Sequence, residues 1–224
     1  FGLVFAEDYV KLVPEDAEDP MMRPMAVITF ENRKSMLPCV YVREREEYES
    51  IEDLEGKVLG ISNPYSTRWI LHEQAGFDGS VYDYFSEVKY MSDFDMAAMI
   101  TALYEEKIDA FVVNKSTYRM AKKPPEAAEI EKLTCEEFVM NFVIAASKDV
   151  PPGVASRVRN LFLNARRDES FKRFEFMFIA IDGQFVPVKE GDLDRTREIA
   201  EFCDEHGCMD DFRKLTGKQD TEAN

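Results

Sequence analysis

The chain has 224 residues, 45% of them hydrophobic and 12% aromatic, so it is long enough for one large domain or two small lobes and differs from a disordered chain. Acidic residues outnumber basic ones by 44 to 28, and the net charge of −16 argues against binding to nucleic acids or to anionic membrane surfaces. No apolar run approaches the roughly 20 residues that are needed to cross a bilayer.

The dominant pattern along the chain is strand, helix, strand, which predicts an α/β fold with parallel strand pairing. The apolar run at residues 1–5 predicts a buried strand, and a helical segment follows around residues 9–13. Further strands are predicted at residues 25–30 and 36–42. The charged segment 43–49 separates them from the next unit.

Residues 57–118 predict two successive strand–helix pairs in one compact βαβ lobe. A strand at 58–61 leads into a helix that opens at the turn Asn63-Pro64 and ends at Gly76. After a strand near 87–91, Ser92 and Asp95 resemble a capping box. The apolar side chains that follow have helical spacing (Met96, Met99, Ile100 and Leu103), and residues 108–113 predict a strand that is covered on both faces.

The C-terminal part is predicted to contain a strand at 138–146 and a helix after the Pro151-Pro152-Gly153 turn. The apolar stripe of that helix is Val154, Val158, Leu161, Phe162 and Ala165. A helix is predicted at 171–178, and the apolar run 174–181 is predicted to belong to the core. A loop or short extended piece at 183–188 and a helix at 193–205 are predicted next. The chain is predicted to end in a polar, frayed tail from residue 216.

The four cysteines leave the redox compartment and the pairing open. Cys203 and Cys208 are close enough in sequence to bridge at a helix end, whereas Cys39 and Cys135 are far apart. Cys203, His206 and Cys208 could also supply three soft metal ligands, but a zinc site would need a distant fourth. We therefore predict no metal and no cofactor.

Enzyme motifs are missing from the sequence. The stretch that begins at His72-Glu73 resembles the start of a zinc-protease helix, but Gly76 stands where the second histidine would be required. There is no Gly-x-Ser-x-Gly, no P-loop and no dinucleotide fingerprint, and the chain has only two histidines. The sequence therefore predicts a protein that is not an enzyme.

Three stretches together resemble the phosphonate-binding family of ABC-transporter solute-binding proteins, over roughly residues 1–200. The first is SIEDLEGK at 50–57, which runs into ISNPYST at 61–67. The second runs from Ala97-Ala98 to the KIDA stretch at 107–110. The third combines Val150-Pro151-Pro152 with FVPV at 185–188 and DLD at 192–194.

The resemblance implies the two-lobed type 2 periplasmic-binding fold, an α/β fold with its ligand between the lobes. Residues 1–43 plus 131–212 would form a discontinuous lobe 1, residues 44–130 an inserted βαβ lobe 2, and residues 213–224 a polar tail. The crossings would lie near residues 39–42 and 135–142. By the same alignment lobe 1 is expected to be incomplete, lacking its opening strands, through truncation or through reduction of the lobe.

The resemblance also implies an oxyanion cradle at Ser66, Thr67 and Arg68, where hydroxyl and amide groups meet at a helix N-terminus. Arg68 replaces a small serine of the family, and it could either fork onto an anion or block the pocket. The structural alternative is that Ser66 is only a helix cap.

Weaker candidates are Tyr9, which falls near a cleft-facing tyrosine of the family, Met96 in place of a histidine and Asn114 in place of an aspartate. The last two replacements argue against an aminophosphonate ligand, and Met96 is as readily explained by packing. Tyr41, Tyr65 and Trp69 are expected near the cleft edge, where they could stack on an organic ligand or hold a cationic amine.

The resemblance implies a periplasmic or extracytoplasmic receptor that binds a small, anionic ligand such as a phosphonate, phosphite or phosphate ester. Its partner would be a membrane permease. The alternative is a sensory ectodomain of a signalling receptor that has the same fold. Neither alternative involves nucleic acid.

Overall fold

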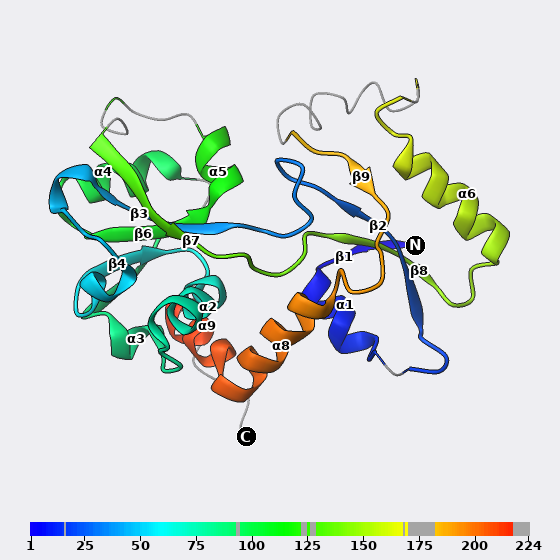
Figure 1. Cartoon of the computed structure of the whole chain (residues 1–224), viewed down its shortest axis with the longest axis horizontal. Coiled ribbons are helices and arrows are strands. Elements are labelled where there is room, and N and C mark those ends of the chain that lie inside the picture. Colours follow the sequence, from blue (N-terminus) through cyan, green and yellow to red (C-terminus); the bar gives the residue numbers. More distant parts are fainter. Residues whose placement is uncertain are drawn as a thin grey trace. The chain divides into compact units, whose positions relative to one another are not determined.

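The computed structural model describes residues 1–15, 17–92, 95–121, 125, 129–167, 169 and 182–216. The chain divides into two compact units. Unit 1 comprises Phe1–Met36 and Phe138–Glu201, and unit 2 comprises Leu37–Glu137 and Phe202–Asn224. Each unit has its own sheet (Figure 1). The lobe boundaries expected from the sequence after residues 43, 130 and 212 stay a prediction.

The predicted parallel strand pairing was wrong for unit 1, which is built on an antiparallel sheet of four strands in the order β1-β8-β2-β9. The strands are β1 (Gly2–Val4), β2 (Met22–Ile28), β8 (Val143–Ser147) and β9 (Phe185–Val186). Among the described residues, the helices are α1 (Ala6–Leu12), α6 (Pro152–Leu163) and α8 (Asp194–His206), the last of which continues into unit 2 after Glu201.

In the part of unit 1 that the structure describes, two apolar clusters form the core. The first packs α1 and the start of α8 against the sheet, and it includes Val27 and Val143. The second packs α6 against Ala26 and Ile144. Only part of the predicted α6 stripe is covered, because Val154 and Leu161 remain 39% and 48% exposed.

The prediction that the strand at residues 1–5 is buried was wrong. A strand forms, but Phe1 is 55% and Leu3 60% exposed. The reason is that β1 is an edge strand that pairs only with β8. Edge strands have one neighbour and bury less of their surface than central strands do.

Unit 2 has a mixed sheet of five strands in the order β5-β4-β6-β3-β7. The parallel pairs are β4 with β5 and β4 with β6, which confirms the predicted βαβ arrangement. The strands are β3 (Pro38–Arg43), β4 (Val58–Ile61), β5 (Glu87–Tyr90), β6 (Ala110–Asn114) and β7 (Ile130–Cys135). In the described part of unit 2 the helices are α2 (Pro64–Ala75), α3 (Val81–Tyr84), α4 (Met96–Tyr104), α5 (Lys115–Met120) and α9 (Cys208–Thr216), with 3-10 turns η1 (Glu44–Glu46) and η2 (Ile51–Leu54).

Local sequence signals explain where the helices of unit 2 begin and end. Ser50 and Asp53 form a reciprocal capping box at η2. Gly76 ends α2 at a φ of 61°, in the left-handed region that favours glycine. The capping box expected at Ser92 was wrong, because Asp95 caps α4 and accepts a hydrogen bond from the amide of Ala98. An aspartate that directly precedes the first helical residue is better placed for this role.

Other elements differ in length from the prediction or lie outside the described residues. The strand expected at 138–146 is shorter, since β8 begins at Val143. The helix expected at 171–178, the apolar run 174–181 and nearly all of the polar tail lie outside the part that the structure describes. Helix α9, which lies just before that tail, was not predicted.

Both possible disulfides are present. Cys39 and Cys135 face each other in the β3–β7 pair and are bonded. Cys203, in the last turns of α8, is bonded to Cys208 at the start of α9. Among the described residues, none of the helices combines the length and the apolar character that a membrane span requires.

Candidate functional site

The N-terminus of α2 holds the serine and threonine on which the predicted cradle depends. Asn63 caps the helix, and its side-chain oxygen accepts a hydrogen bond from the amide of Tyr65 at 2.9 Å. Pro64 occupies the first helical position and has no amide hydrogen to satisfy. The hydroxyls of Ser66 and Thr67 donate to the carbonyl of Asn63 at 3.3 and 3.4 Å.

This arrangement concentrates hydrogen-bonding groups at the positive end of a 12-residue helix. The first amides of a helix have no partner within it, and at α2 the side chain of Asn63 accepts from the amide of Tyr65. Ser66 and Thr67 are 8% and 1% exposed, so their hydroxyls lie in a largely desolvated environment. Such a turn can present backbone amides to an oxyanion that approaches the helix end. Each hydroxyl has a single hydrogen, so Ser66 and Thr67 can donate to that oxyanion only by rotating this hydrogen away from the carbonyl of Asn63.

Arg68 is directed away from solvent and is only 3% exposed. Its Nη2 donates to the carbonyl of Asp78 at 2.7 Å, and its Nη1 lies 3.5 Å from Oδ2 of Asp211 on α9. The guanidinium is therefore engaged by the turn that follows α2 and by α9. Both partners belong to unit 2.

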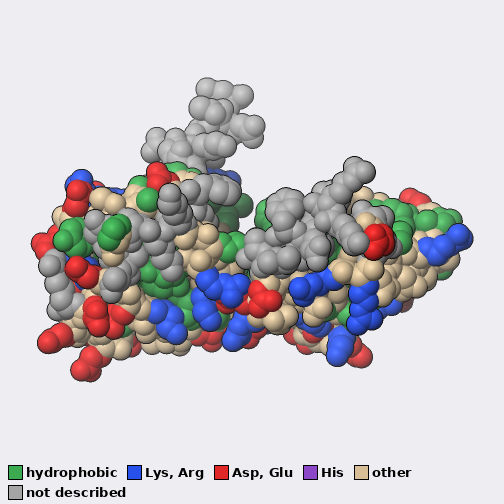
Figure 2. Space-filling view, turned by 90° about the horizontal axis from the view of Figure 1, so that it is seen from above, with side chains coloured by type: hydrophobic (Ala, Val, Ile, Leu, Met, Phe, Trp, Pro, Cys, Tyr) green, Lys and Arg blue, Asp and Glu red, His purple; other side chains and the backbone are tan. Residues whose placement is uncertain are grey.

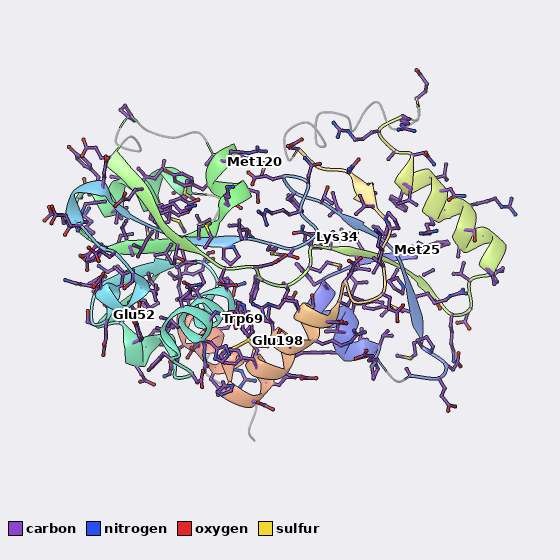
Figure 3. The ribbon with its side chains drawn as sticks, in the orientation of Figure 1. Met25, Lys34, Glu52, Trp69, Met120 and Glu198 are labelled. Atoms are coloured by element: carbon purple, nitrogen blue, oxygen red, sulfur yellow. A yellow bond between two sulfur atoms is a disulfide. The ribbon has the colours of Figure 1, made fainter. Side chains whose placement is uncertain are left out.

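Tyr65, on α2, packs against helix α9. Its ring stacks on Phe212 at a centroid distance of 5.8 Å with 7° between the planes, and its hydroxyl is 3.0 Å from the sulfur of Met209. Trp69, the next aromatic residue along α2, is 1% exposed and donates from its indole to the carbonyl of Glu137 at 3.1 Å (Figure 3).

Tyr41 and Met96 lie together in the core cluster on the α4 side of the sheet. Tyr41 is 4% exposed and stacks against Phe111 and Tyr118, with ring centroids 5.2 and 4.1 Å away. Met96 is 3% exposed. Burial raises the pKa of Tyr118 above that of a free tyrosine, so this hydroxyl stays protonated at neutral pH.

Asn114 ends β6, and its side-chain oxygen accepts a hydrogen bond from the amide of Leu37 at 2.9 Å. That bond directs the carbonyl oxygen of the side chain to the backbone of unit 2. The amide nitrogen of Asn114 is then the group with donor capacity for another partner.

Tyr9 belongs to unit 1, where it is 2% exposed and its hydroxyl is 3.4 Å from the carbonyl of Met22. Burial raises its pKa, and the positive charge of Arg197 partly offsets that effect. Of the eight residues predicted to bind the ligand, seven therefore lie in unit 2, and four of these, Tyr65 to Arg68, are consecutive on α2. Tyr9 is the exception.

His72, the residue that resembled a zinc ligand, forms a pair with Asp78 at 2.6 Å. This hydrogen bond lowers the pKa of Asp78, and the charges on His72, His206 and Arg68 act in the same direction. Among the described residues, no group of three His, Cys, Asp or Glu side chains is arranged to hold a metal ion.

Two residues of this region were missed by sequence reasoning. Asn63 was read only as part of a turn, although Asn-Pro before a helix is a recognisable cap signal. Asp211 could be found only with α9, and the spacing of Met209, Phe212 and Leu215 was the available signal for that helix.

Solved structures of α/β binding proteins share this fold. A binding component of an ABC phosphonate transporter from Pseudomonas aeruginosa is 11% identical with a TM-score of 0.62, over 96% of this chain and 74% of that one. PhnD1 from Prochlorococcus marinus in complex with methylphosphonate is 18% identical (TM-score 0.58; 84% and 72% covered). The aliphatic sulphonate binding protein SsuA from Escherichia coli is 12% identical (TM-score 0.56; 92% and 70%). The class is therefore the type 2 periplasmic-binding fold.

The family model for the periplasmic substrate-binding protein of the phosphonate ABC transporter matches residues 7–193. The chain belongs to this family of periplasmic binding proteins, which capture a small molecule for an ABC permease and are not enzymes. A comparison with curated proteins found no match.

Proposed function

We propose that this protein captures a small tetrahedral oxyanion, of the phosphonate or sulfonate kind, for transport by an ABC permease. The observation that carries the proposal is the first turn of α2, where an asparagine-capped helix end presents Ser66 and Thr67. The family match supports transport over the sensory alternative.

Two further residues support a simple anion over an aminophosphonate. Met96 is buried in the core of unit 2 and carries no proton that could be donated to a ligand. Asn114 is neutral, so it has no negative charge with which to hold an amino group. Tyr41 and Trp69 are covered by protein side chains, which is unfavourable for a cation–π cage.

A thermal-shift panel of methylphosphonate, methanesulfonate, phosphite, phosphate, acetate and methylamine tests the proposal. A ligand at 100 times its dissociation constant stabilises the folded protein by about 2.7 kcal/mol. We expect this effect for at least one phosphorus or sulfur oxyanion. The stabilisation by that oxyanion should be lost in the double variant Ser66→Ala/Thr67→Ala.

The matched control is Thr101→Ala, which removes an exposed hydroxyl from α4 in the same unit. It should leave the shift unchanged. Folded protein that responds to no oxyanion, or a Ser66→Ala/Thr67→Ala variant that responds as the parent does, would contradict the proposal.

A further inference from the structure

Helix α9 packs along α2, the helix that carries Ser66 and Thr67 (Figure 1). Tyr65 stacks on Phe212, and its hydroxyl meets Met209, so aromatic and sulfur contacts flank the first turn of α2. Further along α2, Trp69 meets Phe202 edge to face at 5.4 Å. Phe202, Met209 and Phe212 therefore cover one side of α2.

The centre of this contact is a buried carboxylate. Asp211 on α9 is 2% exposed. Its Oδ1 accepts from the hydroxyl of Ser80 at 2.5 Å, and its Oδ2 accepts from the amide of Val81 at 3.0 Å. The same Oδ2 lies 3.5 Å from Nη1 of Arg68. One side chain thus joins α9 to the start of α3 and to α2.

Arg68 depends on Asp211 for its charge balance. The guanidinium is 3% exposed, and its Nε is buried without a hydrogen-bond partner. A buried charge that loses its partner is strongly unfavourable, so the surrounding structure shifts to reach solvent or another counter-charge. Because Arg68 follows Thr67 directly, any such shift of α2 moves both hydroxyls of the first turn.

We propose that Asp211 is a positioning residue for ligand binding, which acts through Arg68 to hold the first turn of α2 in its binding orientation. The inference rests on the proposed function of Ser66 and Thr67. Binding groups that are displaced by a fraction of an ångström lose affinity even when the fold is intact. Arg68 would then contribute to recognition without touching the ligand.

The test compares Asp211→Asn with Ser80→Ala. Asp211→Asn keeps the size of the side chain but removes the charge that faces Arg68. Ser80→Ala removes the α3 cap and one hydrogen bond to Asp211, but leaves the Arg68 pair in place. The dissociation constants of methylphosphonate and methanesulfonate are measured at least 20 °C below each unfolding midpoint, so that unfolded protein makes no contribution.

We expect Asp211→Asn to weaken binding about tenfold, which corresponds to 1.4 kcal/mol. Ser80→Ala should lower the unfolding midpoint but leave the dissociation constant unchanged. If Asp211 only stabilised the fold, neither variant would change the affinity at this temperature. Equal affinity of Asp211→Asn and the parent would therefore overturn the proposal.

Amide exchange of the ligand-free protein gives a second readout that needs no ligand. Exchange over residues 65–75 should be faster in Asp211→Asn and unchanged in Ser80→Ala. If the parent binds none of the phosphorus and sulfur oxyanions of the thermal-shift panel, the proposed function fails, and unchanged exchange in Asp211→Asn overturns the positioning role separately. If Asp211→Asn does not fold, Arg68→Lys replaces it, because lysine keeps the charge but cannot reach both Asp78 and Asp211. Faster exchange in Arg68→Lys supports the proposal, and unchanged exchange overturns it.

Discussion

Among the described side chains of unit 2, two arginines, Arg43 and Arg68, are buried, and the partners of each stabilise its charge. Arg43 is 5% exposed and donates to the carbonyls of Leu103 and Ile108 at 2.6 and 3.0 Å. Glu46 and Asp109 lie within ion-pair distance of it. Arg68 is matched by Asp211 in the same way. Buried charges of this kind need both hydrogen bonds and a counter-charge. Glu46 is only three residues from Arg43, but Asp109 and Asp211 are distant in sequence from the arginines that they pair with.

A glycine in β4 shows how tightly the sheet of unit 2 is packed. A Cβ on Gly60 would lie 2.8 Å from the sulfur of Met91 and 2.9 Å from Cδ1 of Ile108. We expect Gly60→Ala to destabilise the protein by about 1 kcal/mol, because both side chains must move to make room. Urea unfolding would measure the change.

The control for that prediction is Gly153→Ala near the start of α6, where an added Cβ meets nothing within 4 Å. Alanine there should leave stability unchanged or raise it by a few tenths of a kcal/mol, since glycine is the poorer helix former. A Gly60→Ala variant as stable as Gly153→Ala would show that β4 has more room than the structure indicates.

At the scale of elements, β3 is a buried strand of the unit 2 sheet that has a paired neighbour on each side. It pairs with β6 on one side and with β7 on the other, and all six of its residues are buried. The Cys39–Cys135 disulfide joins β3 to the edge strand β7. The Cys203–Cys208 disulfide closes a much shorter loop, at the junction of α8 and α9.

The two disulfides should contribute unequally to stability. In the chain-entropy account, a crosslink over a separation of 96 residues stabilises more than one over 5 residues. We expect Cys39→Ala/Cys135→Ala to lose about 4 kcal/mol and Cys203→Ala/Cys208→Ala about 2 kcal/mol. Guanidinium unfolding of the two double variants would measure both losses, and a larger loss for the short loop would refute the entropic account here.

At the scale of the whole molecule, the negative charge is unevenly distributed. Most of the excess of acidic over basic residues lies in unit 2, which includes the acidic stretch at residues 44–55. Carboxylates from this unit lie on the face in Figure 2. An anionic ligand must therefore approach against a repulsive field, although local donors hold it once it is bound.

This charge predicts how association depends on salt. The net charge of −16 should slow the approach of methylphosphonate or methanesulfonate at low ionic strength. We expect the association rate to rise about three- to tenfold between about 10 and 150 mM salt, as the screening length shortens. Stopped-flow fluorescence of the single tryptophan, Trp69 on α2, offers a signal. An association rate that falls with salt would contradict this prediction, because it would mean that a local positive potential, and not the net charge, governs the approach of the anion.

Much of unit 2 could be predicted from local signals. The start and end of α2 follow from Asn63-Pro64 and Gly76, and the parallel strands follow from the alternation of apolar strands with helices. The residues of the candidate cradle were predictable because they are consecutive on one helix end. The exposure of β1 and the existence of α9 were not predicted, because both depend on which neighbours each element has.

The sequence by itself determined the α/β class, the family, the approximate positions of many strands and helices and the place of Ser66 and Thr67 at a helix N-terminus. These features depend on residues within a few positions of one another, or on motifs whose order along the chain is sufficient. Only the tertiary structure decided the pairing of the cysteines and the partner of Arg68. The β3–β7 register places Cys39 beside Cys135, and the packing of α9 on α2 places Asp211 beside Arg68, so both depend on contacts between distant segments.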